Sequence, residues 1–203
     1  MARIETIEEL RRLYKAPTER ALRKQLGFID RHCRRFIELS PFLLLSTAGA
    51  DGAADVSPRG ERPGFVTVMD EKTLAIPERP GNNRLDSLTN ILGNPAVGLI
   101  FLIPGFPETL RINGAATIHD DAALRESFAV DGKLPVTVIK VAVREAYLHC
   151  AQSILRSRLW DEAAKADRSL LPTMGQMIKD QAGLADPVES QQDMTERYRK
   201  QLS

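Results

Sequence analysis

The stretch Ile76-Pro77-Glu78-Arg79-Pro80-Gly81-Asn82-Asn83-Arg84-Leu85-Asp86-Ser87-Leu88 organises the rest of the chain. It has the pattern of a strand that ends in a turn, followed by a short helix that opens at the two asparagines. Backbone N–H groups at a helix start carry partial positive charge, and Arg79 and Arg84 flank this turn. The stretch therefore predicts an anion site, and our working hypothesis is a cofactor that carries a phosphate group.

The bulk composition limits the kinds of partner that the protein has. Its 203 residues suffice for one substantial core with helical extensions. Lys and Arg number 28 against 27 Asp and Glu, so the net charge of +1 gives no general attraction to nucleic acid or anionic lipid. No apolar run reaches the roughly 20 residues of a membrane span, and the N-terminus lacks a signal-peptide pattern. We expect a cytoplasmic protein that binds neither nucleic acid nor membrane.

The two cysteines each follow a histidine, in His32-Cys33 and His149-Cys150. Zinc sites space their ligands so that two side chains reach one tetrahedral ion, and adjacent residues do not fit that spacing. We therefore predict no metal site and two thiols that stay reduced. A Cys-His nucleophilic pair stays open as an alternative, although nothing local indicates an activated thiol.

Short segments of β character fill the middle of the chain. Before residue 42, apolar residues recur at helical spacing in two segments, 7–14 and 18–37. Thr6 and Glu9 have the pattern of a capping box at the start of the first, and Gly27 is a possible break in the second. From residue 42 the segments alternate with turn signals and show no βαβ rhythm. They are 42–47, 53–57, 65–69, 73–76, 96–103, 109–118 and 135–147. We predict a mainly β fold with flanking helices, namely a six-stranded antiparallel split β-barrel.

This pattern divides the chain into three parts. Residues 1–40 form N-terminal helices packed on the barrel, 41–148 form the barrel, and 149–203 form a helical segment that contributes to the site or to a dimer. Within the last part, residues 153–166 are expected to form a helix around Trp160, the only tryptophan. Residues 172–203 are polar enough that they order against a partner subunit.

Arginines are the most informative candidates for chemistry, because the common nucleotide-binding loops G-x-G-x-x-G and G-x-x-x-x-G-K-[ST] and the G-x-S-x-G elbow are absent. Four of them lie at strand ends, in turns or in a strand: Arg59, Arg79, Arg84 and Arg111. Their gathering near one phosphate corner favours a site over simple exposure to water. Trp160 fits a stacking or lid residue and a core anchor equally well.

Several motifs in a fixed order resemble the pyridoxamine 5′-phosphate oxidase-related family of FMN-binding split-barrel proteins. The resemblance covers roughly residues 42–161. It rests on Ser57-Pro58-Arg59-Gly60, Pro63-Gly64-Phe65-Val66, Ile76-Pro77 with residues 79–84, Asn94-Pro95-Ala96-Val97-Gly98-Leu99-Ile100-Phe101, Glu108-Thr109-Leu110-Arg111-Ile112-Asn113-Gly114, and His149-Cys150 with Arg156-Ser157-Arg158-Leu159-Trp160.

This resemblance implies a homodimer that holds FMN at the subunit interface and acts as an oxidoreductase on a small substrate. It implies that Asn82, Asn83 and Arg84 hold the FMN phosphate, with Arg79 nearby and Arg59 as a second contact. It also implies that backbone groups around Val66, Thr67, Ala75, Ile76 and Pro77 line the flavin ring, that Thr109 and Arg111 come from the partner subunit or the facing strand, and that Arg158 and Trp160 approach from the C-terminal helix. No side chain is indicated as a catalytic acid or base.

The sequence departs from true pyridoxamine 5′-phosphate oxidases near its C-terminus. The Arg-Leu-His and late Arg-Leu-Ala-Pro elements of their substrate site have no match, and an Arg-Ser-Arg-Leu-Trp-Asp run with a polar tail stands instead. Three alternatives therefore stay open. They are a genuine pyridoxamine 5′-phosphate oxidase, a flavin-binding or flavin-sensing protein without turnover, and a related barrel that binds haem or a deazaflavin.

Overall fold

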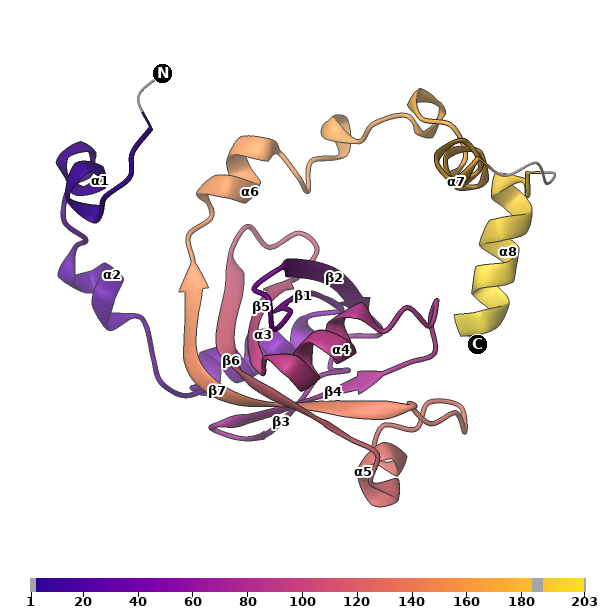
Figure 1. Cartoon of the computed structure of the whole chain (residues 1–203), viewed down its shortest axis with the longest axis horizontal. Coiled ribbons are helices and arrows are strands. Elements are labelled where there is room, and N and C mark those ends of the chain that lie inside the picture. Colours follow the sequence, from indigo (N-terminus) through magenta and orange to yellow (C-terminus); the bar gives the residue numbers. More distant parts are fainter. Residues whose placement is uncertain (1–2, 184–187, 203) are drawn as a thin grey trace. The chain divides into compact units, whose positions relative to one another are not determined.

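The computed structural model describes residues 3–183 and 188–202, and the chain divides into two compact units. Residues 1–157 form the first unit, which contains the β-sheet, and residues 158–203 form the second. Figure 1 follows the chain from its N-terminal helices through the sheet to its C-terminal helices. No helix in the described ranges is both long enough and apolar enough to cross a membrane.

One antiparallel sheet of seven strands makes up the first unit, in the order β2-β1-β5-β6-β7-β4-β3 (Figure 1). The expectation of a mainly β, antiparallel fold with flanking helices is confirmed. The strands are β1 (Phe42–Ala48), β2 (Ala54–Gly60), β3 (Thr67–Asp70), β4 (Thr73–Glu78), β5 (Ala96–Leu102), β6 (Thr109–His119) and β7 (Thr137–His149).

The prediction of six strands in the split barrel is wrong in its count, because the sheet has seven strands, and it does not close. Each segment of β character became a strand, and β3 and β4 form a hairpin of their own on one side of β7. β2 and β3 are the two edge strands, and no backbone ladder joins β2 to β3 or β4 in the described residues. The sheet therefore curls without closing, and side chains bridge its open side.

A bulge between β6 and β7 contributes to this curl. The pairing register shifts between Asn113 and Gly114, because β7 has one residue more than β6 at this point. A Cβ at Gly114 would lie 2.3 Å from the carbonyl oxygen of Ala142, so only glycine fits this close approach. Bulges increase local twist, which lets the two longest strands bend around the core.

Alternate residues of the strands fill the inside of the curled sheet. The fully buried set includes Leu43 and Leu45 of β1, Leu99 of β5 and Ile112 of β6. Helix α3 (Arg31–Leu39) adds Cys33, Phe36 and Ile37, and helix α4 (Asp86–Gly93) adds Ile91. Burial of these apolar side chains is the main stabilising term of the unit.

The N-terminal residues 3–28, called the N-terminal arm below, contain two short helices. In α1 (Ile7–Leu13) the predicted capping box of Thr6 and Glu9 is present. The helix expected over 18–37 is interrupted, because α2 (Glu19–Arg23) ends early and α3 starts only after the Asp30 cap. Leu26 lies between them and exchanges two backbone hydrogen bonds with Ala146 of β7, at 2.8 and 2.9 Å.

Short helices complete both units. In the first unit, α5 (Ala122–Glu126) precedes β7, and α6 (Gln152–Ser157) follows it. The helix expected over 153–166 ends at Ser157, because Arg158 has a positive φ of 54° that breaks the helix. The second unit contains η1 (Glu162–Ala164), η2 (Arg168–Leu170), α7 (Met174–Ala182) and α8 (Gln191–Leu202). That the polar tail orders against a partner stays a prediction.

Candidate functional site: a polar seam and an arginine on the outer face

An ion pair bridges the open side of the sheet between β2 and β4. The Arg59 Nε donates to Glu78 Oε2 at 2.9 Å, and both side chains are only 18% exposed. Arg59 Nη1 donates to the Ser57 hydroxyl at 3.0 Å and to the Pro58 carbonyl at 2.9 Å. The Arg59 Nη2 makes no hydrogen bond to a described residue, so it can still donate to a ligand.

A second ion pair lies beside the first and uses its arginine more completely. Arg79 Nε and Nη2 donate to the two oxygens of Glu61 at 2.6 and 3.2 Å. Arg79 Nη2 and Nη1 also reach the carbonyl oxygens of Phe128 at 2.8 Å and Lys133 at 3.2 Å. Arg79 therefore ties the turn after β4 to the loop between α5 and β7. We call Arg59, Glu61, Glu78 and Arg79 the β2–β4 seam.

A cavity of about 230 Å³ lies along this seam. The seam residues line it together with Phe65 and Pro77, so it joins the ends of β2 and β4. Two arginines and two glutamates leave it without net charge. An anion that enters must therefore share the guanidinium groups with the carboxylates that already hold them.

A chain of polar contacts connects the seam to the start of α4. The Ser57 hydroxyl, which accepts from Arg59, lies 2.8 Å from the Ser87 hydroxyl. Ser87 is buried in the first turn of α4 and donates to Asp55 at 3.0 Å. No side chain caps this helix, because its N-cap position is Leu85 in a left-handed conformation. The N–H groups of the first turn are therefore available to an anion.

The predicted asparagine corner precedes α4 without forming its cap. Asn82 Oδ1 accepts the backbone N–H of Arg84 at 3.1 Å, and Asn83 has a positive φ of 58°. The helix thus opens at Asp86, later than expected, because these two residues build the turn. Arg84 is exposed and pairs with Asp86 at 2.8 Å, and this carboxylate raises the pKa of its guanidinium.

The residues expected to line a flavin ring occupy the β3–β4 hairpin. Val66 is buried, Thr67 is exposed at the start of β3, and Thr67 pairs with Ala75. Ala75 and Ile76 are fully buried, and Pro77 is the one of this group that lines the seam cavity. Their roles toward a flavin stay predictions.

Arg111 and Thr109 lie apart from the seam, on the outer face of β6. Arg111 is opposite Tyr147 of β7, and its guanidinium carbon is 4.2 Å from the centre of the Tyr147 ring. The Arg111 Nε is buried and has no hydrogen-bond partner in the described part of the chain. Thr109 is opposite His149, whose pKa is lowered by burial and by the nearby charges of Arg111 and Lys24.

Two further predicted residues, Arg158 and Trp160, belong to the second unit. Arg158 donates to Asp161 at 2.9 Å within the turn that follows α6. Trp160 is partly buried in the same turn. Both roles toward a flavin stay predictions.

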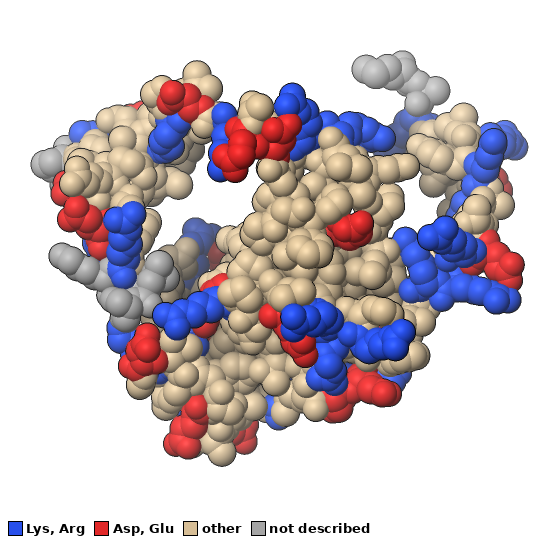
Figure 2. Space-filling view, turned by 180° about the vertical axis from the view of Figure 1, so that it is seen from behind, with Lys and Arg blue, Asp and Glu red and all other residues tan. Residues whose placement is uncertain are grey.

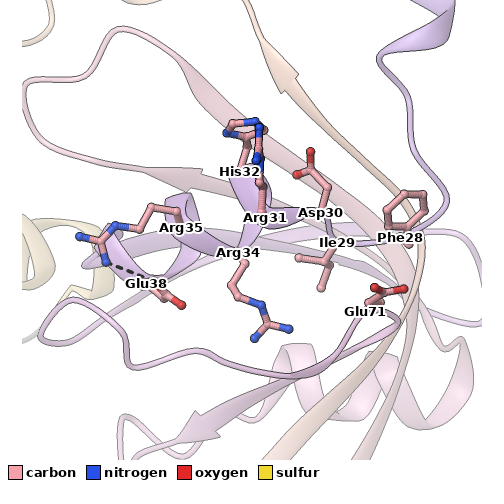
Figure 3. Close-up of a pocket in the computed structure, with 9 residues that line it drawn as sticks. All are labelled: Phe28, Ile29, Asp30, Arg31, His32, Arg34, Arg35, Glu38 and Glu71. Carbon is pink, nitrogen blue, oxygen red and sulfur yellow. Dashed lines mark hydrogen bonds and ion pairs between the residues drawn. The ribbon is translucent and has the colours of Figure 1, made fainter.

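A larger hollow of about 790 Å³ lies beside α3, at a place that the sequence did not indicate (Figure 3). Its charges are mixed, as in the pair of Arg35 with Glu38 at 3.2 Å. The thiol of Cys33, on the same helix, is buried with its pKa raised to about 12, so it does not serve as a nucleophile at neutral pH. Groups of three or more potential metal ligands are absent from the described residues.

Sequence reasoning missed the partners of the candidate arginines. Glu61 and Glu78 were not predicted as ion-pair partners, although Glu78 lies in the opening stretch. Tyr147 and Lys24 were not predicted as neighbours of Arg111 either. The alternation of β7 would have indicated that Tyr147 and His149 share one face. Charges of both signs interleave over the surface in Figure 2, consistent with the net charge of +1.

Comparison with known proteins identifies the family. The family model described as pyridoxamine 5′-phosphate oxidase matches residues 29–150, which is more than half of the chain. The chain belongs to this family. The match spans the whole sheet and includes the seam, the start of α4 and Arg111.

Several solved structures are similar to this chain at low sequence identity. A variant of HupZ from Group A Streptococcus is 18% identical with a TM-score of 0.50, and the match covers 60% of this chain and 99% of that one. An FMN-binding protein from Syntrophomonas wolfei is 8% identical (TM-score 0.44; 58% and 88% covered). An F420 reductase is 18% identical (TM-score 0.40; 57% and 94% covered). No curated protein matches the sequence.

Proposed function

We propose that this protein is an FMN-binding oxidoreductase that moves hydride or electrons between a small substrate and the bound flavin. Membership of the pyridoxamine 5′-phosphate oxidase family supports the flavin. The observation that carries the proposal is the polar chain from the uncapped start of α4 through Ser87 and Ser57 to Arg59. It brings the N–H groups of the first turn of α4 and the Arg59 guanidinium to one corner, and these are the donors that a phosphate needs. The two hydroxyls connect them and donate their own hydrogens toward Asp55.

The donors present fit an FMN phosphate between α4 and β2. Arg59 offers its Nη2, Arg84 offers the part of its guanidinium that Asp86 does not use, and Asn82 and Asn83 shape the turn between them. Arg79 donates to Glu61 and to two carbonyl oxygens. It therefore stabilises the turn that carries the phosphate donors. Bound FMN supplies hydride and electron transfer, and the protein supplies position and electrostatics.

We also propose that the protein is a homodimer that pairs through the outer face of β2, β1 and β5. One face of an antiparallel sheet is usually polar when water covers it. Here that face is apolar, with side chains that are partly or fully exposed: Phe42, Leu44, Val56, Pro58, Ile100 and Leu102. Arg111 borders this face on β6, so a second copy would bring it toward the flavin site of its partner. There its positive charge would stabilise the reduced ring.

The dimer proposal is tested by changing Val56, which is 60% exposed at the centre of β2. Val56→Glu should convert dimers to monomers in sedimentation velocity, because a carboxylate in an apolar interface is costly. Val136→Glu is the control, since Val136 is 53% exposed and precedes β7 away from this face. A wild-type protein that sediments as a monomer at micromolar concentration would contradict the proposal.

Turnover separates the oxidoreductase from its alternatives. Protein loaded with FMN is mixed with NADH or NADPH without oxygen, and reduction is followed by bleaching of the flavin absorbance. Reduction followed by reoxidation with an added acceptor supports the proposal. A bound flavin that no donor reduces favours a binding or sensing protein, and peroxide release from pyridoxamine 5′-phosphate above that of free FMN favours a genuine oxidase of that vitamin.

A further inference from the structure

A group of basic and aromatic side chains gathers on the outer face where β6 and β7 meet the N-terminal arm. Tyr147 is at its centre. The guanidinium carbon of Arg111 is 4.2 Å from the ring centre, Lys24 Nζ is 5.3 Å from it, and the His149 ring centre is 4.9 Å away. We call Lys24, Arg111, Tyr147 and His149 the basic–aromatic cluster.

The N-terminal arm places Lys24 in this cluster. The backbone exchange between Leu26 and Ala146 fixes the arm against β7. Lys24 Nζ donates to the Leu148 carbonyl at 2.8 Å, which uses one of its three hydrogens. The arm thus delivers a cation to the outer face from a segment more than a hundred residues away in sequence.

Positive charge exceeds negative charge at the cluster. The nearest carboxylate is Glu145, which stands 4.0 Å from Arg111 Nη2 and accepts from Asn113 at 3.0 Å. The Arg111 Nε is buried without a hydrogen-bond partner among the described residues. A buried donor without an acceptor is destabilising, so an oxygen atom supplied by a ligand would be stabilising here.

We propose that the basic–aromatic cluster binds the oxyanion, a carboxylate or a phosphate, of the protein's small-molecule substrate. The oxyanion accepts from Arg111 and from the free hydrogens of Lys24, and His149 donates to it once protonated. The Tyr147 ring packs against both cations and so positions them. The assignment of the ligand as a substrate rests on the proposed function, because Arg111 is the residue that we expect to approach the flavin of the partner subunit.

The β2–β4 seam does not compete for this role. Its two arginines are matched by two glutamates, so it carries no excess charge. The cluster has two permanent cations and one carboxylate at the 4.0 Å limit of contact. An anionic substrate would therefore be drawn to the cluster, whereas the FMN phosphate has the separate donors at α4.

The titration of His149 in the full-length protein loaded with FMN tests this site. The chain has three histidines, His32, His119 and His149, so three Cε1–H signals follow pH in NMR spectra, and His149→Gln identifies one of them. Inorganic phosphate and benzoate are the two probes, with sodium chloride at equal ionic strength as reference. Binding of either should raise the His149 pKa by about one unit and leave the other two unchanged.

A matched pair of lysine variants adds a second readout. Lys24→Gln keeps a donor for the Leu148 carbonyl and removes the charge, and it should weaken binding of the probe about two- to fivefold. Lys15→Gln removes a charge from the same arm outside the cluster and should leave the affinity unchanged. A preference for benzoate or for phosphate tells which oxyanion the substrate carries.

Two results would overturn the inference. One is a His149 titration that neither probe moves beyond the effect of chloride, and the other is an equal loss of affinity in both lysine variants. Flavin absorbance of the same samples keeps this test separate from the proposed function. Retained FMN with no anion effect refutes the cluster alone, whereas an anion effect in a protein that does not bind FMN refutes the flavin and the assignment as its substrate.

Discussion

The β2–β4 seam and the basic–aromatic cluster both contain half-buried arginines, but they use them differently. Arg79 donates hydrogen bonds to Glu61 and to two carbonyl oxygens. Most of the Arg59 donors are likewise bonded, to Glu78, Ser57 and Pro58. Arg111 stacks on Tyr147 and keeps a buried Nε without a partner. An arginine with filled donors holds the fold together, whereas we propose that the one with a donor left over binds a ligand.

Removal of Arg79 should have the largest effect on stability among the arginines of the two sites. Arg79→Ala leaves Glu61, only 23% exposed, without its partner and frees the carbonyls of Phe128 and Lys133. We expect the free energy of unfolding to fall by about 3 kcal/mol, measured by urea denaturation of the protein without flavin. Arg111→Gln is the contrasting variant and should leave the urea midpoint nearly unchanged. Equal losses in both would contradict the distinction.

Replacement of Arg84 should leave stability unchanged but weaken the binding of FMN. Its side chain is 71% exposed and, among the described residues, pairs only with Asp86, so Arg84→Ala should not move the urea midpoint. If the FMN phosphate lies at α4, the same variant should bind FMN at least about tenfold more weakly, because a charge-assisted contact is lost. Fluorescence titration with FMN measures this, with Arg168→Ala in the second unit as control. Unchanged affinity would mean that the phosphate lies elsewhere.

Loss of Arg111 should lower the reduction potential of the bound flavin. Arg111→Gln removes a positive charge that would stabilise the reduced ring, so its potential should become more negative than in wild type. Redox titration against dyes of known potential measures the shift. A potential that stays the same would place Arg111 away from the flavin and would remove the ground for assigning the ligand of the cluster as the substrate.

The smallest expected effect is a pH dependence from the cluster. The pKa of His149 in the folded protein is lowered from 6.5, first by burial and then by Arg111 and Lys24. The unfolded chain therefore binds the proton more readily, so stability is complete above about pH 6.5 and declines as the pH falls toward the lowered folded value. Melting temperatures between pH 5 and pH 8 should show this decline, and His149→Gln should flatten it. A profile that the substitution does not change would contradict the assignment.

Much of the fold follows from local patterns in the sequence. Alternating strands and turn residues located all seven strands, and the capping box located α1. The number of strands in the barrel was misjudged, because it depends on how the edge strands are placed after the sheet curls. The prediction of a helix around Trp160 was wrong for a local reason, because Arg158 adopts a left-handed conformation that periodicity does not reveal.

The candidate site was predictable only in part. The turn at Asn82 to Arg84 is visible as a donor-rich corner because all its residues are adjacent in sequence. The partners of the arginines are distant, as in Arg59 with Glu78 across the open side of the sheet and Lys24 beside Tyr147. Such pairs follow from strand order and register, which a single sequence does not display.

The FMN content of the protein decides whether it is a flavoprotein. The apoprotein is titrated with FMN and freed of excess ligand, and its absorbance spectrum gives the number of flavins bound per chain. We expect one FMN per chain, a flavin spectrum, and loss of most of the bound flavin in Arg59→Gln. A protein that retains no FMN, or one purified with a haem Soret band in place of the flavin bands, would contradict it.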